Sequence, residues 1–191
     1  MIRALIGSLV FSFGAAAANA QPVVVEGVSF EPTATLAGQA LVLNGAGLRT
    51  RVFFKVYAAG LYVPQKTADV AALLAQTGPR RVAIGMLRNV DAGTFADALI
   101  EGLKANHTEE QLTALKPQVD RLQATLKSVG EAKKGDAIRL DWIPDTGTQI
   151  VVNGQPRGEP ISGAEFFAAL LRVWLGDKPA DAALKKAMLG S

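Results

Sequence analysis

The chain has 191 residues, a formal net charge of +3 and no cysteine. Without cysteine it has no disulfide, no thiol chemistry and no thiolate metal site, so packing must stabilise the fold. The basic residues are dispersed, and Lys133-Lys134 and Lys185-Lys186 are the only lysine pairs. A chain without a basic stripe is not expected to bind nucleic acid.

The first 20 residues have the pattern of a cleavable export signal. Arg3 precedes an apolar run from Ala4 to Phe13, and Ala18-Asn19-Ala20 has the small residues of a cleavage site. The run is too short to span a bilayer, and no later run is long enough to do so. We therefore expect residues 1–20 to be removed and residues 21–191 to form a single, monomeric domain in a bacterial periplasm.

The first half of the mature chain has mainly strand patterns. The Gly45-Ala46-Gly47 segment has the composition of a turn, and the β-branched and aromatic residues after it predict one long strand that stops at Pro64. A short helix is predicted over residues 70–75. The predicted strands cover residues 23–30, 41–43, 50–63 and 81–87, and in the last of these Val82, Ile84 and Met86 share a core-facing parity.

The second half begins with helices and returns to strands. Phe95, Leu99 and Leu103 predict a helix over residues 92–106, and Thr108 with Gln111 forms a capping box that begins another. Strands are predicted over residues 138–142 and 148–152, and a second capping box, Ser162 with Glu165, precedes a helix that ends at Gly176. Because strands and helices come in blocks, we predict an α+β fold in which a layer of helices backs an antiparallel β-sheet.

Most recognisable catalytic patterns are missing. The single histidine, His107, has no serine or cysteine elbow to accompany it, and neither metal-ligand spacing nor a dinucleotide fingerprint is present. We therefore expect no cofactor and no metal. Arg49 could hold a carboxylate or phenolate, with Tyr57 as a second hydrogen-bond donor. The alternative is that Arg49 is a solvated turn residue and Tyr57 an ordinary strand aromatic.

Residues 44–63, NGAGLRTRVFFKVYAAGLYV, resemble the opening motif of the chalcone isomerase family. Segments 87–95 and 171–189 are similar to later segments of that family, so the resemblance extends along the mature chain. It implies an antiparallel sheet covered by helices, with a ligand cleft between the two layers. The residues that match in the opening motif are Gly45, Ala46, Gly47, Arg49, Lys55, Ala58, Gly60 and Tyr62.

The resemblance also implies which residues would form the site. Arg49 matches the arginine that holds the substrate in the plant enzymes. Their threonine, tyrosine, asparagine and final hydroxyl residue are replaced here by Tyr57, Phe95, Gly102 and Val173. An arginine with a tyrosine in place of that threonine is similar to the fatty-acid-binding branch of the family. We therefore expect non-catalytic binding of a fatty acid or a similar amphipathic or aromatic ligand, with Arg49 as the anion anchor, Tyr57 as the second donor and Phe53, Phe95, Val173 and Trp174 as pocket walls.

Two other functions remain open at this level. The first is an isomerase, an intramolecular lyase of chalcone-isomerase type, because cyclisation of an acidic phenol needs mainly orientation and charge stabilisation. The second is an envelope interaction protein whose cleft is filled. The binding hypothesis requires Arg49 and Tyr57 to lie close enough to contact one ligand. In one uninterrupted strand Arg49 and Tyr57 would lie roughly 26 Å apart at about 3.3 Å per residue, so sharing a ligand requires a bend between Thr50 and Phe54.

Overall fold

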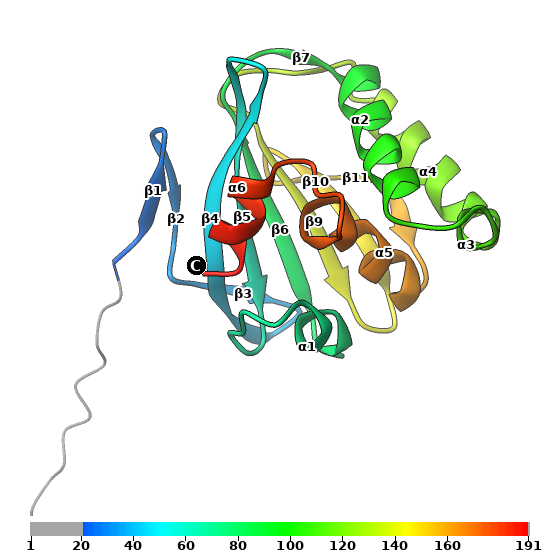
Figure 1. Cartoon of the computed structure of the whole chain (residues 1–191), viewed down its shortest axis with the longest axis horizontal. Helices are drawn as coiled ribbons and strands as arrows, with labels where there is room; N and C mark the ends of the chain where they lie inside the picture. The colour runs from blue at the N-terminus through cyan, green and yellow to red at the C-terminus, as the bar shows by residue number, and fades with distance from the viewer. Residues whose placement is uncertain (1–20, 191) are drawn as a thin grey trace, which may run out of the picture.

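The computed structural model describes residues 21–190, so the expected export signal at residues 1–20 lies outside the described residues. Seven strands form an antiparallel sheet in the order β11-β10-β9-β6-β5-β4-β3, with helices against one of its faces (Figure 1). This arrangement confirms the α+β fold predicted from the sequence. The strands are β3 (Thr33–Leu36), β4 (Gln39–Arg51), β5 (Phe54–Val63), β6 (Arg80–Met86), β9 (Ala137–Ile143), β10 (Gly147–Val152) and β11 (Gln155–Ile161).

Two short strand pairs and six helices complete the described residues. The β1–β2 hairpin packs on the outer face of the sheet, and β7 pairs with β8 beside the start of α2. The short strands are β1 (Val23–Val25), β2 (Val28–Phe30), β7 (Val90–Asp91) and β8 (Glu131–Ala132). The helices are α1 (Val70–Ala75), α2 (Ala92–Ala105), α3 (Glu109–Ala114), α4 (Lys116–Lys127), α5 (Ala164–Leu175) and α6 (Ala182–Met188).

The main core lies between the sheet and the helices. Val82, Ile84 and Met86 are all buried on this side of β6, as their shared parity predicts. Helix α5 contributes Phe166 and Trp174, which are fully buried. A smaller core on the opposite face of the sheet is covered by the β1–β2 hairpin and is made of Phe30, Leu36, Leu41, Leu43, Ala58 and Tyr62.

The turn predicted at Gly45-Ala46-Gly47 is wrong, because these residues lie inside β4. Their glycines are required for space: a Cβ on Gly45 would lie 2.0 Å from the carbonyl oxygen of Ala187, and one on Gly47 would lie 2.5 Å from the Ala187 side chain. Helix α6 therefore packs directly on the backbone of β4. Close approach of a second backbone is a common reason for glycine inside a strand.

The single strand predicted over residues 50–63 is also wrong. The chain reverses at Val52 and Phe53, and this two-residue turn joins β4 to β5 as a long hairpin. Glycine or asparagine normally marks such a turn, and neither is present, which is why the run reads as continuous strand. Val52 has a φ of 57°, a conformation that is unusual for a β-branched residue.

Helix ends agree with the sequence at one capping box and differ at the other. The side chains of Thr108 and Gln111 make both hydrogen bonds of the box that begins α3. The box predicted at Ser162 and Glu165 does not form, because α5 begins after Gly163 and no side chain caps it. The φ of Gly163 is 106°, so the backbone enters this helix through a conformation that suits glycine.

Candidate ligand-binding site

The β4–β5 hairpin brings Arg49 and Tyr57 together. Their Cα atoms are register partners across the two strands, and directly opposed residues have Cβ atoms about 4.5–5.5 Å apart. The separation of roughly 26 Å applies only to an uninterrupted strand. The turn at Val52 and Phe53 supplies the bend that the sequence argument required, and it lies inside the Thr50–Phe54 interval.

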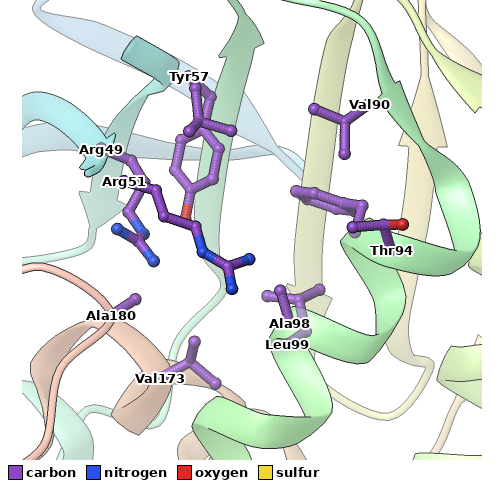
Figure 2. A pocket seen from close by; sticks show the side chains of 11 residues that line it. Arg49, Arg51, Tyr57, Val90, Thr94, Ala98, Leu99, Val173 and Ala180 are labelled. Carbon is purple, nitrogen blue, oxygen red and sulfur yellow. The ribbon is translucent and has the colours of Figure 1, made fainter. Parts of the chain in front are cut away.

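The two residues open onto a cavity of about 80 Å³ between the hairpin, helix α2 and the end of helix α5. Arg49, Arg51 and Tyr57 reach the cavity from the hairpin, and Thr94 reaches it from the first turn of α2 (Figure 2). The rest of the lining is apolar and consists of Val56, Val90, Phe95, Ala98, Leu99, Val173 and Ala180. The cavity thus combines one cationic end with apolar walls.

Tyr57 is held rigidly at the inner end of this cavity. The indole Nε1 of Trp174 donates a 2.9 Å hydrogen bond to the phenolic oxygen of Tyr57, and Phe95 packs edge-on against the phenol ring at 6.2 Å. Burial raises the pKa of Tyr57, although Trp174 and Arg49 act in the opposite direction. The phenol is therefore neutral at physiological pH. Since its oxygen already accepts from Trp174, its own O–H group is the part that can donate to a ligand.

Arg49 is positioned by the backbone and not by a carboxylate. Its Nη1 donates to the carbonyl oxygen of Thr50, whose own N–H donates to Asp181 Oδ2 at 3.0 Å. Asp181 Oδ1 in turn accepts from the N–H groups of Ala183 and Leu184 at the start of α6. Within residues 21–190, neither Arg49 nor Arg51 makes an ion pair, so the guanidinium charges remain available to an anionic ligand.

The pKa of Asp181 is lowered by these contacts. Burial by itself would raise that pKa, but hydrogen bonds from the backbone of Leu184, Thr50 and Ala183, together with the charge of Arg49, outweigh it. The carboxylate is therefore ionised at neutral pH and fastens the hairpin to the first turn of α6. Its stabilising contribution is present above the ordinary aspartate pKa and is lost as the pH falls through the lowered value.

Two of the four predicted wall residues line the cavity, and two do not. Phe95 and Val173 line the cavity. Phe53 does not, because it lies in the turn of the hairpin with 91% of its surface exposed; this expectation is corrected. Trp174 lies behind Tyr57 and is 1% exposed, so it supports the phenol and does not line the cavity. Sequence reasoning missed Arg51, although residues two apart on a strand face the same side, and it also missed Thr94.

Close packing of two helices keeps the cavity small. A Cβ on Gly102 of α2 would lie 2.7 Å from Cγ1 of Val173 on α5, so these helices meet at the glycine. The absence of a side chain at Gly102 therefore lets α2 approach α5 at Val173, which lines the cavity.

The single histidine and the acidic residues among residues 21–190 do not form a catalytic or metal-binding group. Nδ1 of His107 lies 2.8 Å from the carbonyl oxygen of Leu103, one turn earlier at the end of α2. Among residues 21–190, no three His, Cys, Asp or Glu side chains are grouped so that they could hold a metal ion. In the same part of the chain, no helix is both long enough and apolar enough to pass through a membrane.

Replacing Tyr57 by phenylalanine is expected to lower the free energy of unfolding by about 1–3 kcal/mol, the cost of leaving a buried donor unsatisfied. The Nε1 of Trp174 has its hydrogen bond to Tyr57, and the variant removes that acceptor. Urea denaturation measures the change. The double variant Tyr57→Phe/Trp174→Phe should cost less than the sum of the two single variants. Additive losses would show that this hydrogen bond contributes nothing to stability.

Comparison with known proteins agrees with this architecture. Residues 22–190 match the family model described as chalcone isomerase-like, and the chain belongs to that family. The resemblance of residues 44–63 is thereby confirmed. No curated protein matches the chain. Among solved structures, the fold is similar to that of a fatty-acid binding protein from Arabidopsis thaliana, with a TM-score of 0.65 and 15% identity over 88% of this chain and 96% of the other. At that identity the likeness concerns the fold.

Proposed function

We propose that this protein binds an amphipathic carboxylate without transforming it. One observation carries the proposal: two arginines without ion-pair partners among the described residues, and a neutral tyrosine hydroxyl, face a single apolar-walled cavity. Arg49 and Arg51 supply charge-assisted hydrogen bonds to the carboxylate, which are stronger than those between neutral groups. Tyr57 donates a further hydrogen bond. The similar fold of a fatty-acid binding protein supports this assignment.

The cavity volume limits how much of the ligand is enclosed. A dry cavity of about 150 Å³ accommodates benzene, and the cavity beside Arg49 measures about 80 Å³. The carboxylate and the first few carbons therefore fill it, against Phe95, Leu99 and Val173. The remainder of a longer acyl chain lies outside the cavity. A short or medium-chain carboxylate is the ligand class that this space fits.

Native mass spectrometry of protein purified from its own host tests the proposal. The expected result is a bound species that is released by denaturation and is identified as a carboxylic acid. Apoprotein that also fails to bind added octanoate would overturn the proposal. Purification from a host grown with isotopically labelled acetate supplies a control, because a ligand made by the cell carries the label and a contaminant of the reagents does not.

An isomerase of chalcone-isomerase type is the alternative function, and three positions at which the family resemblance implies a polar side chain have none here. Phe95 and Val173 line the cavity without a polar group, and Gly102 contributes no side chain. Chalcone cyclisation is therefore expected to proceed at close to the spontaneous rate, followed by the loss of chalcone absorbance. Phe95→Tyr is not expected to restore it, because catalytic groups that act together are strongly non-additive. Rapid turnover by the unchanged protein would contradict the binding function.

Export and the oligomeric state belong to the same proposal. The Ala18-Asn19-Ala20 sequence supports cleavage before Gln21 and export to the periplasm. We propose that the mature protein is a monomer there. The intact mass of the protein from the host's periplasmic fraction is expected to correspond to residues 21–191. A full-length species retained in the cytoplasm would refute export.

A further inference from the structure

The end of the β4–β5 hairpin exposes a cluster of large apolar side chains. Val52 is 76% exposed, Phe53 91% and Phe54 59%; we call these three residues the hairpin tip. The tip lies at the end of the two longest strands, next to the segment that leads into β7 (Figure 1). Three adjacent large apolar side chains are unfavourable in water. Exposed apolar patches often mark a site that contacts a protein or a membrane.

The turn chemistry at the tip is a second and independent anomaly. A two-residue hairpin turn whose first residue has a positive φ is the usual place for glycine. Val52 occupies that position with a φ of 57°, and Phe53 follows it. Backbone strain of this kind persists where function or the surrounding structure requires it. The backbone conformation of the turn therefore disfavours Val52, and the exposure of Phe53 lowers solubility, so neither residue is explained by the fold.

Basic residues lie close to the tip. The guanidinium of Arg88 lies 4.5 Å from the centre of the Phe54 ring, and Arg51 pairs with Phe54 in the register of the hairpin. The segment that carries Lys133 and Lys134 runs beside Asn89, the neighbour of Arg88, since the backbone N–H of Lys134 donates to the side chain of Asn89. Within residues 21–190 none of these four basic residues makes an ion pair. We call Arg51, Arg88, Lys133 and Lys134 the basic cluster.

Acidic residues in the same region offset only part of the charge of the basic cluster. Glu26 is paired with Lys55 at 2.7 Å. Glu131 accepts a hydrogen bond from Asn89, and Asp136 accepts from the side chain of Asn153 and the backbone of Lys133. A hydrogen bond from a neutral group leaves Glu131 and Asp136 charged, so these two residues and Asp91, the register partner of Glu131, offset much of the charge of Lys133 and Lys134. Arg51 and Arg88 lie next to Phe54 and make no ion pair within residues 21–190, so the positive charge is concentrated directly beside the exposed aromatic side chains.

We propose that the hairpin tip inserts into the interface of an anionic lipid membrane while the basic cluster contacts the lipid headgroups. Apolar residues that enter the acyl boundary, flanked by Lys and Arg near anionic lipid, are the two components of peripheral membrane binding. A protein partner is a poorer match, because three side chains supply far less area than a stable protein interface requires. Arg51 belongs both to the basic cluster and to the cavity lining, so the docked hairpin holds the cavity next to the membrane.

With the hairpin tip in the membrane, a carboxylate ligand can pass between the membrane and the cavity. This point rests on the proposed function. The acyl carbons that do not fit the cavity would remain in the membrane while the carboxylate reaches Arg49. Membrane binding itself depends only on the hairpin tip and the basic cluster. It is therefore tested separately from carboxylate binding.

The test uses the full chain carrying Phe53→Trp, with vesicles of phosphatidylcholine alone or with roughly one third phosphatidylglycerol, an anionic lipid. The two natural tryptophans, Trp142 and Trp174, are buried, so a change in emission on addition of vesicles reports the tip. The expected results are a blue shift with anionic vesicles, quenching by brominated acyl chains and loss of both at high salt. Unchanged tip emission would overturn the proposal, even if residues 1–20 bind the vesicles.

Two further variants identify the residues responsible. Val52→Gly/Phe53→Asn places favourable turn residues at the tip, so the variant should fold normally while its affinity for anionic vesicles falls at least tenfold. Arg88→Glu should also weaken vesicle binding, whereas Lys186→Glu makes the same change in charge on α6 and should have little effect. Equal vesicle affinity in wild type and the Gly-Asn variant would overturn the proposal. A dimer that depends on the tip, detected by sedimentation without lipid, would instead assign the tip to a second copy of the chain.

Discussion

Replacing Arg49 by alanine is expected to weaken octanoate binding by about 1.5–3 kcal/mol, the range for a hydrogen bond to a charged group. This corresponds to a loss of affinity of about 10- to 140-fold. Arg49 lies opposite Tyr57 in the hairpin, and its charge has no ion-pair partner within residues 21–190. The charge of Arg49 also helps to lower the pKa of Asp181, but the backbone hydrogen bonds of that carboxylate do not depend on Arg49, so removal of the side chain should leave the fold intact. Isothermal titration calorimetry with octanoate measures the difference.

Three controls separate a specific anchor from general charge. Arg49→Lys should recover only part of the affinity, because an ammonium cannot reproduce bidentate geometry. Arg121→Ala removes an exposed arginine from α4, outside the cavity, and should bind octanoate like the wild type. Octanol lacks the carboxylate, so Arg49→Ala should change its affinity little. If Arg49→Ala and Arg121→Ala, both folded, bind octanoate equally well, Arg49 is only a strand residue and the proposed site is wrong.

Replacing Gly45 by alanine is expected to destabilise the protein by about 3 kcal/mol, the upper end of the range for overpacking. The new Cβ would lie 2.0 Å from the carbonyl oxygen of Ala187 and 3.0 Å from the N of Gly190. These are backbone atoms, so relief requires movement of α6 as a whole. That helix buries Leu184 and Met188 in the main core. Urea denaturation monitored by circular dichroism measures the loss.

A matched pair of glycines makes this prediction specific. Gly47→Ala meets the Cβ of Ala187 at 2.5 Å, so Ala187→Gly should restore part of the stability that Gly47→Ala removes. The same second substitution should not rescue Gly45→Ala, because the clash there involves the backbone. Equal rescue of both variants would show that α6 does not rest on β4 as described.

The elements with strong local periodicity were predictable from the sequence. Alternation of Val82, Ile84 and Met86 and the four-residue spacing of Phe95, Leu99 and Leu103 each reflect which side of an element is buried. The capping box at Thr108 is likewise a local pattern. The block order of strands and helices was sufficient for the α+β class.

The hairpin was not predictable from local composition, because the glycines that suggest a turn do not lie in the actual turn. Glycines occur at positions 45 and 47, where a helix needs space, and the actual turn is formed by Val52 and Phe53. Turn statistics therefore predict a turn at residues 45–47, where there is none, and miss the turn at Val52 and Phe53. The contact between α6 and β4 that explains the glycines joins residues more than 130 positions apart, and no local window contains it.

The residues of the candidate site could be predicted from the sequence, but their arrangement could not. Arg49 and Tyr57 were recognisable by residue type, and Phe95 and Val173 by their place in the family pattern. Their meeting depended on a turn that the sequence conceals. Trp174 hydrogen-bonds to a tyrosine 117 residues earlier, so its supporting role required the tertiary structure. Arg51 could have been found, since its i, i+2 relation to Arg49 puts both on one side of a strand.

The cavity walls come from three widely separated segments, and this has a consequence for the order of events during synthesis. Residues 49–57 and 90–99 leave the ribosome long before Val173 and Ala180, which complete the lining. Asp181, which joins the hairpin to α6, follows directly after them. A nascent chain that ends before these residues lacks part of the cavity lining. Because domains generally fold as units, capture of a ligand in this cavity is confined to the finished chain.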